Sequence, residues 1–337
     1  MKNVLVVGSG LSGAVLSRLL ADSGKFRISV IEKRNEIGGN IFDFTNSKGI
    51  RVHKYGPHLF HTNNETVANF VKKYSEWVEY KHKVKAMLDD GRYVTLPVNN
   101  ETKNIVGEDR IVETFYRPYS EKMWGMKLEQ LSPDIMNRVP VRDDDNEYYF
   151  PNDKFQLIPE KGYSHFINQL FKHELISLKT NTPFNKEMEN DFDLVLNSMA
   201  IDEYYDFKFG RLEYRSIKFH HLDLPLPRIL PSAVVNFTHK GPFTRITEWK
   251  VIPCHGQNDM YTSVTYEEPC DPQFNNDEKY YPVKDLDGIN RDLYNKYKEI
   301  KNDKVIFIGR LGLYSYLDMD QCINISLQTA KKILNNY

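Results

Sequence analysis

Residues 4–13 read VLVVGSGLSG, an apolar run that passes directly into Gly8, Gly10 and Gly13. Apolar residues at near-helical spacing follow, and the next apolar run ends at Glu32. Strand, glycine turn, helix, strand and terminal acid in this order are typical of a Rossmann unit. The glycines let the backbone approach a pyrophosphate at the positive end of the helix, and the acid can accept hydrogen bonds from ribose hydroxyls. The sequence therefore predicts an N-terminal dinucleotide site.

A second glycine turn, Gly38-Gly39, comes soon after Glu32. The acid at this position disfavours a ribose that carries a 2′-phosphate. A glycine pair at this distance from the acid resembles the FAD-binding oxidase superfamily, so we expect FAD rather than NAD. The expected cofactor-binding residues in this part of the chain are Gly8, Gly10, Gly13, Glu32, Lys33, Gly39 and Asn40.

Length and charge limit the classes of function. The 337 residues are enough for a large core and more than one domain. The formal net charge is only −1, from 45 basic and 46 acidic residues, which gives no electrostatic reason to expect binding to nucleic acid or an anionic membrane. No segment approaches the ~20 apolar residues that a membrane span needs, and the N-terminal apolar run is too short for a signal peptide. We expect a cytoplasmic protein.

The three cysteines, Cys254, Cys270 and Cys322, are widely spaced and match no metal-ligand or redox pattern. We expect them to be reduced and mostly buried.

Later apolar runs indicate that the nucleotide-binding domain is discontinuous. Residues 194–196 and residues 305–308 are expected to add strands to its sheet, and the apolar positions from Ile323 to Leu334 predict a helix with one apolar face. Residues 99–136 are predicted to be mainly helical. Residues 148–150 and 243–250 are predicted to be strands of a second layer.

The expected class is thus α/β, with a Rossmann-like FAD-binding domain that is discontinuous in sequence, a small helical domain and a second β-sheet layer. Four segments are expected. They are the first FAD-binding part (1–96), a reduced helical substrate or lid domain (97–137), a mixed sheet with a mobile arginine loop and a return to the FAD domain (138–250), and a continuation of the sheet with the C-terminal FAD-binding part (251–337).

Beyond the glycine turns, separate stretches of the chain resemble the UDP-galactopyranose mutase family, flavoenzymes that interconvert the pyranose and furanose forms of a nucleotide-linked galactose. Their order and spacing cover nearly the whole chain. Between Pro97 and Tyr119, however, this chain has fewer residues than the helical domain of the family normally uses. The matching stretches are residues 52–62, 119–125, 138–142, 213–216, 242–246 and 309–311, the last leading to 316–320.

The resemblance implies an isomerase that interconverts UDP-galactopyranose and UDP-galactofuranose through a sugar adduct at N5 of the reduced flavin, for cell-surface polysaccharide synthesis. FAD must then be reduced by an external reductant such as NAD(P)H or a reductase, and a homodimer is compatible with the family. Two alternatives stay open. One is a mutase of another nucleotide sugar, for example a dTDP-linked 6-deoxy sugar, and the other is an FAD-dependent oxidase.

A nucleotide diphosphate is best held by arginine, whose planar fork pairs with two phosphate oxygens. Arg138 and Arg245 are the candidates, and the resemblance places Arg138 on a mobile loop. For either arginine the alternative is a surface ion pair. His58 completes the expected catalytic set.

The remaining candidates also follow from the resemblance. His58, His61 and Arg310 are expected to contact FAD, and no metal is expected, because no third ligand at a sensible spacing follows the two histidines. Asp318 has the alternative role of capping the last helix, and Tyr280 can replace Tyr281 if the register differs by one residue. The expected substrate-binding residues are Phe115, Tyr119, Trp124, Tyr149, Tyr281, Tyr316 and Asp318.

Overall fold

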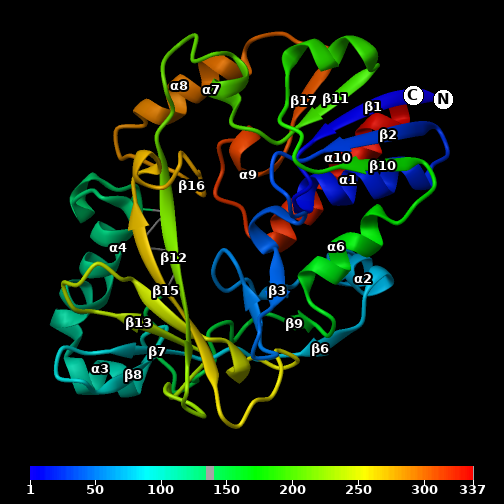
Figure 1. The fold of residues 1–337 in the computed structure, drawn as a ribbon. Coiled ribbons are helices and arrows are strands. Elements are labelled where there is room, and N and C mark those ends of the chain that lie inside the picture. The colour runs from blue at the N-terminus through cyan, green and yellow to red at the C-terminus, as the bar shows by residue number, and fades with distance from the viewer. Residues whose placement is uncertain (134–139, 337) are drawn as a thin grey trace.

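The computed structural model describes residues 1–133 and 140–336 and contains two large sheets, which lie on opposite sides of the view in Figure 1. The first is a parallel five-stranded sheet in the order β10-β2-β1-β11-β17. This order is of the doubly wound, nucleotide-binding kind. Its strands are β1 (Lys2–Val7), β2 (Phe26–Ile31), β10 (Ile176–Lys179), β11 (Leu194–Asn197) and β17 (Val305–Phe307).

Helices cover both faces of this sheet. On one face, α1 (Leu11–Asp22), α6 (Tyr163–Phe171) and α10 (Met319–Asn336) bury residues such as Leu16, Phe166 and Ile323 in a core shared with the strands. On the other face, Leu5 and Val195 pack with Tyr204 of the short helix α7 (Ile201–Tyr204). Burial on both faces explains why these strands read as continuous apolar runs rather than alternating ones.

The second sheet has seven strands in the order β16-β12-β15-β14-β13-β7-β8. All its pairs are antiparallel except β13 with β7. The longest strands, β12 and β15, pair with each other along most of their length (Figure 1). The strands are β7 (Val84–Met87), β8 (Tyr93–Leu96), β12 (Tyr214–Leu224), β13 (Val234–Phe237), β14 (Arg245–Glu248), β15 (Thr262–Cys270) and β16 (Tyr281–Pro282).

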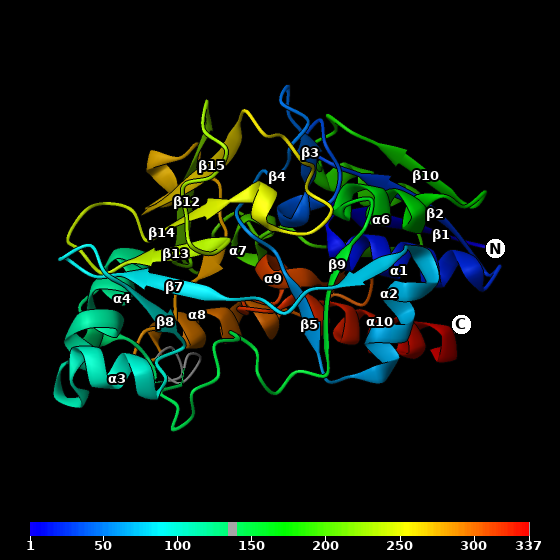
Figure 2. The same cartoon turned by 90° about the horizontal axis from the view of Figure 1, so that it is seen from below.

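A small helical unit packs on β7 and β8. Figure 2 shows α3 (Asn100–Val106) and α4 (Arg117–Trp124) beside these strands, far from the N-terminus. Val106, Ile111 and Phe115 share a core with residues of β7 and β8. Single-turn elements complete the unit, namely η2 (Glu108–Arg110), the π-helical η3 (Val112–Tyr116) and η4 (Leu128–Gln130).

Two small antiparallel sheets connect these parts, and Figure 2 shows the second of them between the two large sheets. The first joins β3 (Asp43–Thr45) to β4 (Arg51–His53), and the second contains β5 (Phe60–Thr62), β6 (Trp77–Glu79) and β9 (Phe155–Pro159). The other elements are α2 (Glu65–Tyr74), α8 (Ile289–Lys298), α9 (Gly309–Gly312), η1 (Gly39–Ile41), η5 (Lys186–Asp191), η6 (Trp249–Val251) and η7 (Pro272–Phe274).

The α/β class is confirmed, and so are the two distant strands predicted to join the N-terminal sheet. The strand prediction for residues 148–150 is wrong. Tyr148 makes only an isolated bridge to Lys83, because Arg142 donates to the carbonyl of Tyr148 at 2.8 Å and bends the chain into a loop. Strands β7 and β8 belong to the second sheet, so the expected first segment, residues 1–96, reaches into both sheets.

The cysteines are free, but they are more accessible than expected. Cys254 is exposed and Cys270 and Cys322 are half-buried, so the prediction of mostly buried thiols is wrong. Cys254 lies in the turn after η6, where its φ is +63°. Within residues 1–133 and 140–336, no helix combines the length and apolar character that crossing a membrane requires.

Candidate functional site

The first glycine turn is closed so tightly that side chains are excluded from it. Gly8 has φ +98°, and a Cβ atom there would lie 2.0 Å from Ser198 Oγ. A Cβ atom at Gly13 would lie 2.1 Å from the carbonyl oxygen of Gly8. Helix α1 therefore starts directly against the end of β1, and its N-terminus points into the turn.

The second glycine turn touches the first. Gly38 donates its amide to the carbonyl of Ser9 at 3.1 Å, and Gly10 and Gly38 form a parallel bridge. A Cβ atom at Gly39 would lie 3.0 Å from the α-carbon of Gly10. The two turns thus pack against each other through the backbone of their glycines.

Glu32 holds the first turn from the end of β2. Its Oε2 accepts hydrogen bonds from the amide of Ser9 at 2.9 Å and from Ser9 Oγ at 2.8 Å, and its Oε1 accepts from the amide of Arg34 at 3.0 Å. The carboxylate is nearly buried. Lys33 is exposed and lies 3.7 Å from Glu278, whereas Asn40 lies within η1 beside the second turn.

These residues fit a dinucleotide. The first amide of α1 that is bonded within the helix is that of Ala14, which donates to the carbonyl of Gly10 at 2.9 Å. By helix geometry the preceding amides point out of the helix end, where they can bind a pyrophosphate. The missing side chains at Gly8, Gly13 and Gly39 allow close approach to this end.

The second half of the site centres on an ion pair between neighbouring strands. Arg245 of β14 lies directly opposite Glu267 of β15, and Arg245 Nε is 2.8 Å from Glu267 Oε1. The Glu267 carboxylate is buried, while a quarter of the Arg245 side chain is exposed. Burial alone disfavours the charge of Arg245, but Glu267 and Tyr119 outweigh it and hold the pKa of Arg245 well above its usual value. Arg245 stays charged.

Arg310 is the second cation of the site and is half-buried. Its guanidinium lies 5.0 Å from the ring centre of Tyr281 and 5.1 Å from that of Tyr316. These two rings stack at 4.9 Å with an 18° angle between their planes. Arg310 donates to the carbonyls of Tyr280 at 3.3 Å and Leu317 at 2.7 Å. Backbone acceptors and π-faces thus hold Arg310 in place.

Tyrosines connect the two cations. Burial raises the pKa of Tyr119, which lies within the electrostatic reach of Arg245, Tyr316 and Tyr149. Burial also raises the pKa of Tyr281, which Arg310 and Arg245 both influence. The phenols of Tyr119 and Tyr281 therefore keep their protons at neutral pH and can donate hydrogen bonds to an anion.

Trp124 and Phe115 border this group. The Trp124 ring meets Tyr281 edge-on at 6.5 Å between ring centres. Phe115 is buried in the core of the helical unit, with Tyr149 packed against that core. Asp318 precedes α10 and lies within electrostatic reach of Arg310. Arg138 lies outside the described residues.

The two histidines of the Gly-Pro-His-Leu-Phe-His stretch have different surroundings. His58 Nδ1 lies 2.9 Å from the carbonyl of Gly56, and burial with the nearby charges of Arg310 and Arg245 lowers the pKa of His58 to about 4. His58 is therefore neutral at pH 7, with Nδ1–H donating and Nε2 carrying a lone pair. His61 stacks on Phe150 at 3.6 Å, and its Nδ1 is 2.6 Å from Asp153 Oδ2.

Sequence reasoning missed two residues of this site, His82 and Glu267. Burial, Arg245 and His61 lower the pKa of His82 to about 3, so it is a neutral ring beside the cation. In the sequence His82 lies between Lys81 and Lys83, a pattern that indicates a solvent-exposed segment. Glu267 continues the buried polar positions Ser263 and Thr265 of β15, and no local sequence pattern distinguishes it from them.

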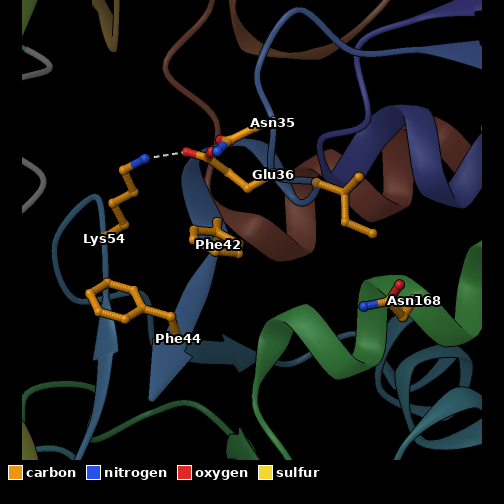
Figure 3. Close-up of a pocket in the computed structure, with 7 residues that line it drawn as sticks. Asn35, Glu36, Phe42, Phe44, Lys54 and Asn168 are labelled. Atoms are coloured by element: carbon orange, nitrogen blue, oxygen red, sulfur yellow. Dashed lines mark hydrogen bonds and ion pairs between the residues drawn. The ribbon is translucent and has the colours of Figure 1, made fainter. Parts of the chain in front are cut away.

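An open hollow of about 610 Å³ lies on the outside of the second glycine turn (Figure 3). The ion pair of Lys54 and Glu36 lies at the hollow, and Phe42 and Phe44 line it. None of its lining residues belongs to the arginine and tyrosine group. In the part of the chain that the structure describes, no group of three or more His, Cys, Asp or Glu side chains could hold a metal ion.

Known proteins resemble this chain along its whole length. The family model for UDP-galactopyranose mutase matches residues 114–316, and the model for an NAD(P)-binding Rossmann-like domain matches residues 6–74. A probable UDP-galactopyranose mutase of Klebsiella pneumoniae is 34% identical over 374 aligned positions, which cover 99% of this chain and 95% of the relative. A dTDP-fucopyranose mutase of Escherichia coli is 33% identical, covering 100% of this chain and 99% of the relative.

The fold agrees with these relatives. The crystal structure of a reduced UDP-galactopyranose mutase superposes with a TM-score of 0.78 at 14% identity, covering 100% of this chain and 94% of that one. The alignment of 374 positions to the Klebsiella protein exceeds the 337 residues of this chain, so that relative contains insertions. A shortened helical unit in this chain is consistent with such insertions. That the insertions lie in the helical unit stays a prediction.

We predict that Gly13→Ala lowers the free energy of unfolding by about 1–3 kcal/mol, because the new Cβ must push against the carbonyl of Gly8. Urea denaturation of the cofactor-free protein measures this. The matched control is Gly10→Ala, where the nearest atom is 3.8 Å away. Equal stability of the two variants would contradict the steric account.

We also predict that Glu267→Gln lowers the free energy of unfolding by about 2–3 kcal/mol, because it leaves the Arg245 cation without its buried partner. The control is Glu147→Gln, which removes the carboxylate from an ion pair with Lys83 that is exposed on both sides and should cost less than about 1 kcal/mol. Chemical denaturation at pH 7 compares the two. A Glu267 variant no less stable than the Glu147 variant would refute the importance of the pair.

Proposed function

Because the chain belongs to the UDP-galactopyranose mutase family, we propose that it interconverts UDP-galactopyranose and UDP-galactofuranose with the help of reduced FAD. The observation that carries the proposal is the convergence of Arg245 and Arg310 with a group of half-buried tyrosines. A site with two fixed cations and protonated phenols suits a nucleotide diphosphate, which carries two negative charges and offers many acceptor oxygens.

FAD would be held by the two glycine turns, the N-terminus of α1 and Glu32. Glu32 is already bonded to Ser9, so its contact with the ribose would extend an existing network rather than order a free side chain. Arg310 and the loop that carries His58 complete the expected contacts. When bound in its reduced form, the flavin supplies the nucleophilic nitrogen N5 and hence the covalent part of the isomerisation.

Arg245 and Arg138 are proposed to hold the diphosphate while it leaves the sugar and returns. Negative charge grows on the departing diphosphate, and a cation fixed in advance stabilises that charge without reorganisation. The Glu267 carboxylate holds the Arg245 side chain from the strand opposite and leaves part of it exposed towards a ligand. Arg138 has this role by resemblance alone.

The tyrosines are proposed to orient the nucleotide and the phosphates. Tyr281 and Tyr316 offer stacked rings beside Arg310, whereas Tyr119 of α4 lies near Arg245 and within electrostatic reach of Tyr149 in the loop before β9. Phe115 and Trp124 would close the apolar side of the pocket, and Asp318 would bind a sugar hydroxyl. His58 Nε2, unprotonated at pH 7, can accept a hydrogen bond from the bound cofactor or substrate.

One further candidate has direct support. The relative from Escherichia coli, a dTDP-fucopyranose mutase, matches this chain as completely as the UDP-galactopyranose mutases do. A mutase of a dTDP-linked 6-deoxy sugar is therefore the second candidate. The external reductant, such as NAD(P)H or a reductase, the homodimer and the use of the product for cell-surface polysaccharide stay predictions.

The function is tested by an anaerobic assay with dithionite-reduced, FAD-loaded protein and UDP-galactofuranose. Chromatography follows conversion to the pyranose, with oxidised protein as the control. Conversion by the reduced protein alone is expected. Conversion of a dTDP-linked 6-deoxy sugar alone would select the second candidate, and reduction of the flavin by a substrate without dithionite would identify an oxidase.

Arg245→Ala and Arg138→Ala are each expected to retain FAD and to lose about 100-fold or more in kcat, because each removes a positive charge from the proposed diphosphate site. The matched control is Arg92→Ala, since Arg92 is exposed and pairs with Asp90 near the tip of a turn. The assay above measures all three variants. Turnover at the wild-type rate in both site variants would exclude this use of the arginines.

A further inference from the structure

A histidine network, buried at His53 and His255 and exposed at His221, contacts the loop of residues 54–58, which leads from β4 to the expected flavin contact at His58. We propose that His53, His255 and His221 are positioning residues that hold this loop in place through their neutral tautomers, and that protonation of the network releases the loop. The proposal rests on the proposed function only in taking the loop to face the flavin. The network itself is visible in the hydrogen bonds of the chain.

The first part of the network fixes the tautomer of each ring in turn. The amide of His58 donates to His53 Nδ1 at 3.1 Å, so this nitrogen must be unprotonated. A neutral His53 then has its proton on Nε2, which donates to His255 Nε2 at 2.9 Å. His255 in turn has its proton on Nδ1, which donates to the carbonyl of Pro253 at 2.9 Å. One tautomer of each ring satisfies all three contacts.

A second set of hydrogen bonds reaches the same loop from the other sheet. Trp249 Nε1 donates to Thr265 Oγ1 at 2.7 Å, and this hydroxyl is 2.7 Å from His221 Nδ1. His221 Nε2 lies 3.1 Å from the carbonyl of Lys54. The carbonyl accepts, so Nε2 carries the proton and Nδ1 accepts from Thr265. Trp249 also packs against His53 at 4.8 Å and so joins the two sets.

The surroundings favour neutral rings. His53 and His255 are buried. Burial, together with His255, His58 and Arg51, lowers the pKa of His53 well below its usual value, and burial with Arg51 lowers that of His255 to about 4. Burial also lowers the pKa of His221.

Charged and titratable groups face the network from every element around it. Arg51 of β4 is itself 4.0 Å from Asp43 of β3, and Tyr163 of α6 meets His53 edge-on at 5.3 Å. On the flavin side, Arg310 and Arg245 act on His58. Around His221 lie Lys54 and His220, which oppose a further proton, and Asp223, which favours it.

These shifts give the direction of the pH dependence. The unfolded chain would protonate these rings near their ordinary pKa of 6.5, whereas the folded chain does so only at lower pH. The stabilising contribution is therefore complete above about pH 6.5 and is lost as the pH falls towards 4. A second proton on His53 or His255 would set two N–H groups against each other.

The loop has little room to move without disturbing the site. A Cβ atom at Gly56 would lie 2.9 Å from Glu267 Oε1, so the loop backbone packs directly on the partner of Arg245. On the outside, Tyr55 donates to Glu36 Oε1 at 2.8 Å, and Lys54 pairs with the same carboxylate beside the hollow of Figure 3. Release of the loop would thus affect both halves of the site.

The test compares His255→Gln with His255→Phe. The glutamine amide oxygen can accept from His53 Nε2 and does not titrate, whereas phenylalanine fills the space without an acceptor. Hydrogen–deuterium exchange at neutral pH follows the amide of His58 in the full chain, with and without FAD. We expect exchange about tenfold faster in His255→Phe than in the wild type, with protection restored in His255→Gln. His165→Phe, a half-buried histidine of α6 outside the network, is the control.

A second measurement covers the case in which His255→Phe does not fold. The absorption spectrum of oxidised FAD in the wild-type holoenzyme is recorded from pH 8 to pH 3.5, and a reversible change is expected only as the pH falls towards 4, where the rings of the folded chain take up protons. Unaltered exchange in His255→Phe, or a spectrum independent of pH, would overturn the proposal. If mutase activity is absent while the exchange and spectral effects occur, the proposed function fails and the positioning network stands.

Discussion

The structure depends on a steric constraint at the end of β1, where α1 can begin only if the α-carbon of Gly13 carries no side chain. The carbonyl oxygen of Gly8 occupies the place of that side chain at 2.1 Å, and Gly8 itself has a backbone conformation that favours glycine. This contact sets the angle at which α1 crosses the parallel sheet and so determines how α1 meets α6 and α10. The stacking of the second glycine turn on the first requires the same backbone path. The contact between Gly13 and Gly8 therefore shapes both the expected cofactor-binding turns and the packing of the main core.

The candidate site holds its two arginine cations in different ways. Arg245 has a buried carboxylate partner across the strands, whereas Arg310 is held by carbonyl oxygens and aromatic faces. The tyrosines and His58 near them are kept uncharged by burial, and the cations further disfavour a proton on the histidine. Positive charge is thus concentrated on two rigid groups, and the neutral groups around them can donate or accept single hydrogen bonds.

The fold could be predicted from the sequence wherever a local pattern of residues is required by one kind of structure. Gly8, Gly10 and Gly13 identified the nucleotide turn because few other arrangements need glycine at that spacing, and the apolar runs at Leu194 and Val305 identified buried parallel strands. Residues 148–150 failed because their path is set by a side chain six residues earlier, Arg142, which no periodicity reveals. The family resemblance brought together Tyr119, Tyr281, Tyr316, Arg245 and Arg310. His82, His255 and Glu267 were missed because their importance comes from partners distant in sequence.

The order of the strands has a consequence for the synthesis of the chain. Strand β11 pairs on one side with β1 and on the other with β17, which lies more than a hundred residues later. Until residues 305–307 have been synthesised, β11 is an open sheet edge, and α10 is not yet there to cover α1. A nascent chain therefore exposes apolar helix and strand surface during most of its translation. Strand β17 and helix α10 cover this surface, and ribosome-bound chains that lack them should be clients of holding chaperones.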